Sequence, residues 1–193
     1  MSTVAGLATR ERLLAAAREL IETGGYGSAS VVAIAERTGV AAATLYRHFV
    51  SKEELFIEVF RDVCAGEERA MRAAADEAGP GAVDRLEAVL ATFARRALQN
   101  RSLAWALLAE PVDPLVDAER LAYRRRYSEL VGRELRAAIQ AGEIPVQDVA
   151  FTAAVLVGGC GEALVGPLSS AAGGEEVLSA IQTFVRRAVG AAA

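Results

Sequence analysis

The chain carries its most versatile hydrogen-bonding side chains in one short stretch of its 193 residues. Thr44, Tyr46, Arg47 and His48 are almost contiguous, and Lys52 follows them. Groups of these types donate hydrogen bonds to phosphate oxygens, and an arginine can also contact a base edge through two parallel bonds. His48 is the only histidine, so a histidine-based triad and a multi-histidine metal site are both excluded. The pattern favours binding over catalysis, and we expect no enzyme, no metal and no cofactor.

Two short predicted helices joined by a glycine turn position these side chains. Ser30 can cap a helix over residues 31–38, and Gly39 can supply the left-handed residue that ends it. In the next helix, Leu45 and Phe49 lie four residues apart and should face the core, which leaves the polar side chains on other faces. Ser51 precedes Lys-Glu-Glu and signals the start of a third helix. Proteins use this arrangement to place one helix in the major groove of DNA.

Residues 34–40, 44–49 and 51–55 read Ile-Ala-Glu-Arg-Thr-Gly-Val, Thr-Leu-Tyr-Arg-His-Phe and Ser-Lys-Glu-Glu-Leu. This series resembles the N-terminal signature of TetR-family transcriptional regulators. The resemblance implies an all-α fold, with a helix-turn-helix DNA-binding domain over residues 1–52 and an effector-binding and dimerisation domain over residues 53–193. In that reading Arg47 is the best candidate for contacting a base edge. The full set of predicted DNA-binding residues is Ser30, Thr44, Tyr46, Arg47, His48 and Lys52.

The sequence departs from the family pattern in two ways. Ala41, Ala42 and Ala43 open the second helix, where the family often has a serine, a basic residue and a glycine, and alanines donate no side-chain hydrogen bonds. Residues 1–60 contain six cationic and seven anionic side chains, a net charge of −1, so any attraction to DNA must be local. These departures leave an alternative open: a small-molecule-binding sensor or carrier with a degenerate DNA-binding head.

The composition predicts helix nearly everywhere. Hydrophobic residues make up 53% of the chain, and strand-like alternation is scarce. Apolar periodicity and Gly or Pro breaks give about nine helices. Besides the two short ones, they are expected near residues 9–23, 52–78, 84–100, 102–110, 115–141, 146–168 and 175–189.

The same data bear on location. The net charge of −4 argues against a general nucleic-acid coat and against a protein that binds anionic membranes. Cys64 and Cys160 are far apart in the sequence, which favours reduced thiols in a cytoplasmic protein over a disulfide or a metal site. No targeting segment is apparent at the start of the chain. Between residues 149 and 174 the only charge is Glu162, and we expect this segment to be a helix buried against protein, not a membrane span.

The last two predicted helices present small and apolar side chains, and corresponding helices form the dimer in TetR-like proteins. The resemblance therefore implies a homodimer and, as the DNA target, an inverted repeat. The core of a single-chain bundle is the other reading of these helices. The predicted interface residues are Val155, Gly158, Gly159, Leu178, Ile181, Phe184 and Val185.

The middle helices should surround a pocket for a small-molecule effector, again by resemblance. Large side chains on inward faces, some of them aromatics with polar tips, suit a mostly apolar pocket, although for each one taken singly plain core is the simpler interpretation. The candidates are Phe93, Trp105, Leu108, Tyr123 and Tyr127. Arg124, Arg125 and Arg126 are expected on a solvated face. Together these expectations describe a ligand-responsive regulator, most simply a repressor that its effector releases from DNA.

Overall fold

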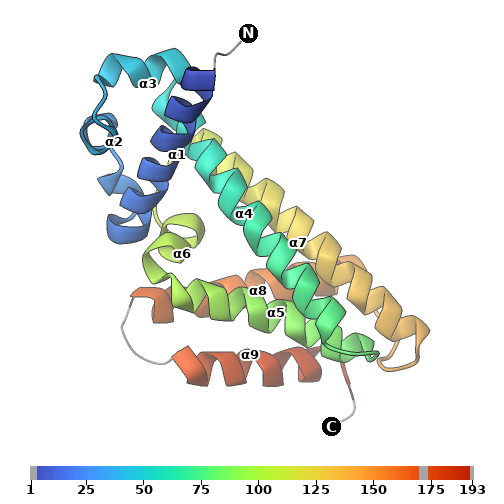
Figure 1. Cartoon of the computed structure of the whole chain (residues 1–193). Coiled ribbons are helices and arrows are strands. Elements are labelled where there is room, and N and C mark those ends of the chain that lie inside the picture. Colours follow the sequence, from blue (N-terminus) through green and yellow to red (C-terminus); the bar gives the residue numbers. More distant parts are fainter. Residues whose placement is uncertain (1–3, 170–173, 192–193) are drawn as a thin grey trace. The chain divides into compact units, whose positions relative to one another are not determined.

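A computed structural model describes residues 4–169 and 174–191, and within these ranges it contains helices and no strand (Figure 1). The predicted all-α class is confirmed, and most predicted helix ends lie within three residues of those observed. The first helix starts earlier than predicted, and residues 170–173 of the long apolar segment lie outside the described ranges. The elements are α1 (Val4–Gly24), a 3-10 turn η1 (Tyr26–Ser28), α2 (Val31–Thr38), α3 (Ala42–His48), α4 (Lys52–Glu77), α5 (Ala82–Gln99), α6 (Arg101–Leu108), α7 (Pro114–Gln140), α8 (Val149–Ser169) and α9 (Gly174–Ala188).

The chain divides into two compact units. The N-terminal unit contains Met1–Val63 and Asn100–Arg120, and the C-terminal unit contains Cys64–Gln99 and Leu121–Ala193. The short helix α6 thus groups with α1 to α3 although α5 precedes it in the sequence. The predicted division at residue 52 concerns function, and it stays a prediction.

The N-terminal unit has its core where α1, α2 and α3 meet. Leu13, Ile34 and Leu45 are completely buried there. The predicted caps of α2 are confirmed, because the Ser30 hydroxyl accepts a hydrogen bond from the Ala33 amide at 3.1 Å and Gly39 is left-handed with φ 68°. These caps end α2 sharply and allow α3 to leave in a new direction.

In the C-terminal unit, α5 packs against both α8 and α9, which also contact each other. Leu86 of α5, Leu156 of α8 and Val185 of α9 are fully buried in this core. The N-terminus of α5 is capped from a distance: the Glu143 carboxylate accepts hydrogen bonds from the Ala82 and Val83 amides at 2.9 and 2.8 Å. These two bonds stabilise the charged form and lower the pKa of Glu143.

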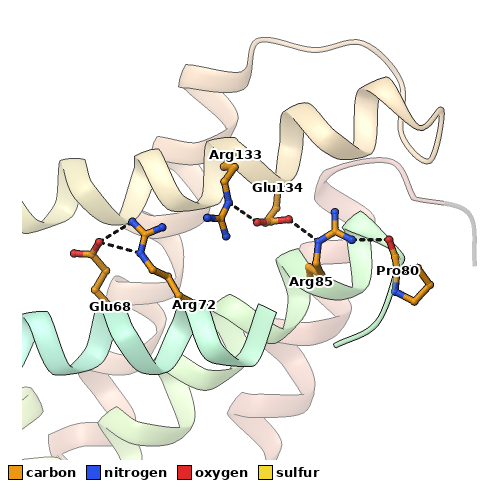
Figure 2. A network of polar contacts seen from close by, with 6 residues as sticks. All are labelled: Glu68, Arg72, Pro80, Arg85, Arg133 and Glu134. Atoms are coloured by element: carbon orange, nitrogen blue, oxygen red, sulfur yellow. Dashed lines mark hydrogen bonds and ion pairs between the residues drawn. The ribbon is translucent and has the colours of Figure 1, made fainter. Parts of the chain in front are cut away.

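Two buried carboxylates in the C-terminal unit are held by arginines (Figure 2). Glu134 on α7 pairs with Arg85 and with Arg133, each at 2.8 Å. Glu68 on α4 accepts from Arg72, one turn further along, at 2.7 Å. A buried carboxylate is tolerated when it is paired, and removing one partner typically costs about 3–5 kcal/mol. The contacts join α7 to α5 and fix the register of these helices within the unit.

Candidate functional site

Helix α3 has one buried face and one free face. Leu45 and Phe49 are buried as the sequence predicts, while 55% of the Tyr46 surface is exposed and Arg47 is exposed too. Thr44 and His48 are half-buried at the edges of the free face. The alanines that open α3 are also exposed, so the helix start presents a smooth surface without side-chain donors. The free face can therefore approach a partner closely, with its polar groups concentrated toward the C-terminal end.

Arg47 differs from the other arginines of the DNA-binding head, residues 1–60, in its partners. Arg12 donates to the backbone carbonyl of Thr38. Arg10, Arg18 and Arg37 each form an ion pair with a glutamate. No carboxylate in the described ranges pairs with Arg47, whose guanidinium donates to the Thr44 hydroxyl at 3.0 Å. That single contact orients the side chain along the free face of α3 and leaves most of its donors for an external acceptor.

Lys52, in the first turn of α4, lies against aromatic rings. Its ammonium is 5.1 Å from the centre of the Tyr26 ring and 4.9 Å from that of Phe56. Both distances are within the range of a cation–π interaction, which fixes the ammonium without neutralising its charge. Ser51 caps α4 as predicted, accepting from the Glu54 amide at 3.2 Å, while the Glu54 carboxylate accepts from the Val50 amide. The two contacts make α4 begin at a defined point, four residues after the end of α3.

Ser30 is exposed, and its hydroxyl already accepts the capping bond of α2. The hydroxyl hydrogen is a separate donor, so capping and contact with an acceptor outside the protein are compatible.

The five predicted pocket residues fall into two groups. Phe93, Tyr123 and Tyr127 form an aromatic cluster in the C-terminal unit, with ring centres 5.8 Å apart for Phe93 and Tyr127 and 6.1 Å apart for the two tyrosines. The Tyr127 hydroxyl donates to the Cys64 carbonyl at 3.2 Å, and burial raises its pKa. Trp105 and Leu108 are half-buried on α6, in the N-terminal unit.

The three consecutive arginines of α7 are all exposed, as expected, and the last of them also has partners within the chain. These residues are Arg124, Arg125 and Arg126. Arg126 pairs with Glu68 at 2.8 Å, and its guanidinium lies 4.9 Å from the centre of the Tyr123 ring. It therefore belongs to the polar contacts of the C-terminal unit.

The predicted interface residues divide between the surface and the core. Val155 and Phe184 are 43% and 45% exposed, Leu178 is half-buried, and Gly158 and Gly159 are exposed with no atom within 4 Å of an added Cβ. Ile181 and Val185, in contrast, are buried inside their own chain, because that face of α9 packs on α5. At these two positions the single chain leaves no free surface, as the alternative of a single-chain core expects, and the dimer interface itself stays a prediction.

Helix α8 is long and apolar enough to cross a membrane by length and composition, yet only 22% of its most apolar window is buried in the single chain. The prediction of a helix buried against protein thus holds for one face, which carries Leu156, Cys160 and Leu164. Burial also raises the pKa of Cys160 to about 11. The opposite face leaves an apolar surface uncovered.

Sequence reasoning missed Glu110, which follows α6. Its carboxylate accepts hydrogen bonds from the Tyr26 amide at 2.7 Å and from the Gly27 amide at 3.2 Å. The residues joined are more than eighty positions apart, and no motif near residue 110 signals the contact.

Comparisons with known proteins match both parts of this architecture. The N-terminal model of the "Bacterial regulatory proteins, tetR family" matches residues 13–59, and that of the "Tetracyclin repressor-like, C-terminal domain" matches residues 79–164. The HTH-type transcriptional regulator UidR of Escherichia coli K12 is 33% identical over 152 residues, which span 77% of this chain and 76% of UidR. The chain belongs to the TetR family of transcriptional regulators. In this TetR-family protein the helix-turn-helix is α2 and α3, and a ligand-binding domain follows it.

Solved structures show the same fold along nearly the whole chain. The fatty acid degradation regulator FadR from Bacillus halodurans aligns with a TM-score of 0.79 at 18% identity, covering 91% of this chain and 93% of that one. FadR from Bacillus subtilis, crystallised with stearoyl-CoA, aligns with a TM-score of 0.75 at 21% identity and covers 95% of this chain and 99% of its own. Both confirm the predicted fold.

Proposed function

We propose that this TetR-family protein is a ligand-responsive repressor that binds an inverted-repeat operator as a homodimer and is released by a small-molecule effector. The observation that carries the proposal is the free face of α3, where Arg47 has no carboxylate partner within the described ranges. The same face supports contact with DNA by the hydroxyl of Tyr46 and the imidazole of His48.

The roles of the side chains follow from their donors. Arg47 would contact a base edge, because a guanidinium can bond two acceptors of guanine at once. Tyr46, His48 and Lys52 would contact phosphates and position the head, with Ser30 and Thr44 at the margins of the same surface. The smooth alanine start of α3 allows close approach to the backbone of the duplex.

The uncovered face of α8 and the neighbouring side of α9 support dimerisation. A stable interface buries about 1,600 Å² in total and is apolar at its centre. Val155, Gly158, Gly159 and Phe184 offer such a centre, and the glycines permit close approach of two backbones. A twofold dimer carries two α3 helices, which matches an inverted repeat.

The effector would bind in the domain over residues 53–193. It would lower operator affinity by favouring a state of the dimer in which the two DNA-binding heads have the wrong spacing for the inverted repeat. The coupling can be no larger than the preference of the effector for that state. The aromatic cluster of Phe93, Tyr123 and Tyr127 supports an apolar pocket wall within the C-terminal unit. The relatives named above are transcriptional regulators, and we propose that this protein is likewise a cytoplasmic transcriptional regulator and not an enzyme.

The test begins by selecting duplexes from a random pool with the wild-type protein, followed by a fluorescence-anisotropy titration on the selected duplex. Arg47→Ala should weaken binding by about 1–3 kcal/mol and relax the preference at one base position of each half-site. Arg18→Ala is the matched control, because it removes the same charge from an exposed arginine of the head that is paired with Glu22. It should change the affinity little.

Two results would contradict the proposal. Failure of the wild-type protein to enrich any duplex would leave the sensor or carrier with a degenerate head as the function. Equal losses for Arg47→Ala and Arg18→Ala would remove Arg47 from base contact, since the effect would then be one of total charge.

A further inference from the structure

The turn between α1 and α2 is held from outside by a carboxylate. Glu110 accepts from the backbone amides of Tyr26 and Gly27, which are successive donors of η1. A carboxylate that accepts two backbone N–H groups makes strong, charge-assisted bonds. Gly25 comes so close that a Cβ there would lie 2.9 Å from Glu110 Oε2. The contact is therefore close-fitting as well as charged.

Glu110 is itself fixed from behind. The Arg120 guanidinium donates to the carbonyls of Ala106 and Glu110, both at 2.6 Å. The Ala106 carbonyl lies in the last turn of α6, where helix geometry leaves acceptors without a helical partner, and the Glu110 carbonyl lies just beyond the helix. The carboxylate thus projects from a braced helix end.

The same turn contacts one of the proposed DNA-binding residues, Lys52 of α4, through the ring of Tyr26. The ring of Tyr26 packs against that of Phe56, with centres 4.3 Å apart. The ammonium of Lys52 lies over both rings, within cation–π distance of each. Glu110 therefore holds the backbone of Tyr26, and the ring of Tyr26 contacts the Lys52 ammonium.

We propose that Glu110 is a positioning residue for DNA binding, acting through the backbone and ring of Tyr26 to place the Lys52 ammonium for contact with a phosphate. The inference rests on the proposed function, because it needs Lys52 at the DNA. Its unusual feature is the sign of the effect. Removing a negative charge from a DNA-binding protein ordinarily strengthens binding, whereas removing this one should weaken it.

The experiment compares Glu110→Gln with Glu119→Gln on the selected duplex at several salt concentrations. Both substitutions remove one carboxylate from the N-terminal unit, but Glu119 pairs with Arg61 and does not hold the turn. Glu110→Gln should weaken binding about tenfold, because the amide places a donor opposite one of the two N–H groups. Glu119→Gln should leave binding unchanged or slightly stronger.

The salt dependence separates positioning from a general loss of structure. A lost phosphate contact lowers the slope of log K against log salt by about 0.9, hence by about 1.8 in a dimer with two copies. Lys52→Met should lower the slope by that amount, Glu110→Gln should lower it toward the same value, and the double variant should lower it no further. Amide hydrogen exchange at Tyr26 and Gly27 should accelerate in Glu110→Gln and not in Glu119→Gln.

The outcomes separate this inference from the proposed function. If the wild-type protein selects no duplex, the proposed function fails and this inference fails with it. If the wild-type protein binds and Arg47→Ala weakens it, but Glu110→Gln keeps the wild-type slope, the inference alone is overturned. A wild-type slope for Lys52→Met would overturn it as well, because the ammonium would then contact no phosphate.

Discussion

Substitution of Gly25 by alanine tests whether the contact between Glu110 and η1 stabilises the N-terminal unit. Gly25 has φ 76° and ψ −178°, a combination that is essentially restricted to glycine. Gly39 offers a matched comparison: its φ is 68°, and no atom lies within 4 Å of an added Cβ. Alanine at Gly39 therefore meets only backbone strain, whereas alanine at Gly25 also meets the Glu110 carboxylate.

The two costs can be worked from this geometry. Left-handed backbone costs a residue with a Cβ about 1–2 kcal/mol, and we expect that for Gly39→Ala. The conformation at Gly25 costs about 1–3 kcal/mol. Glu110 ends a flexible side chain and can rotate away from a Cβ at 2.9 Å, but rotation breaks its bonds to the turn. Loss of a hydrogen bond to a charged group costs about 1.5–3 kcal/mol, so with the backbone strain Gly25→Ala should cost about 2.5–6 kcal/mol.

The measurement is the free energy of unfolding from urea titration, with the Glu110→Ala background closing a double-mutant cycle. In that background Gly25→Ala should cost only its backbone strain, while the cost of Gly39→Ala should be the same in both backgrounds. Equal costs of Gly25→Ala with and without Glu110 would refute the reasoning, because the carboxylate would then contribute nothing to holding the turn.

Two further predictions concern the C-terminal unit. Because the pKa of Glu143 is lowered in the folded protein, its charged form stabilises the fold above the ordinary carboxylate pKa, and this stabilisation is lost as pH falls through the native pKa. In urea titrations Glu143→Gln should therefore be less stable than wild type at pH 7 and should approach wild-type stability below about pH 4. A stability difference that does not change with pH would contradict the cap on α5. Phe184→Asp should raise the dimer dissociation constant at least about tenfold in sedimentation experiments, because it places an unpaired charge in an apolar interface. The control is Leu115→Asp, at an exposed apolar position of α7, which should leave the dissociation constant unchanged. Equal effects of the two substitutions would remove α9 from the interface.

The elements of this fold were predictable because their signals are local. Ser30 and Gly39 mark the ends of α2 through bonds within a few residues, and the spacing of Leu45 and Phe49 identifies the buried face of α3. The sequence predicts that α9 carries a row of apolar side chains, but it does not predict which of them are buried in their own chain and which are exposed. Ile181 is covered by its own chain and Phe184 is not, and one hydrophobic pattern serves both kinds of burial.

Contacts between distant segments were beyond the reach of the sequence. The bond from the Tyr26 amide to Glu110 depends on α6 packing against α1, which no local pattern specifies. The contact of Lys52 with two aromatic rings has the same origin, since Tyr26 and Phe56 approach each other only in the folded unit. A lysine in the first turn of a helix predicts an exposed charge, but not that rings hold it in one place.

Formal charge also proved a poor guide to the electrostatics of the head. Residues 1–60 sum to −1, which argues against attraction to DNA. Glutamates nevertheless pair with Arg10, Arg18 and Arg37, and each pair is nearly neutral when seen from a few ångströms away. Arg12 donates to the Thr38 carbonyl, which leaves Arg47 and Lys52 as the cations of residues 1–60 that neither pair with a carboxylate nor bond to a backbone carbonyl in the described part of the chain. They lie at the end of α3 and the start of α4. The field that a phosphate meets at this surface is set by which charges are paired, so an acidic head can still present a locally positive face.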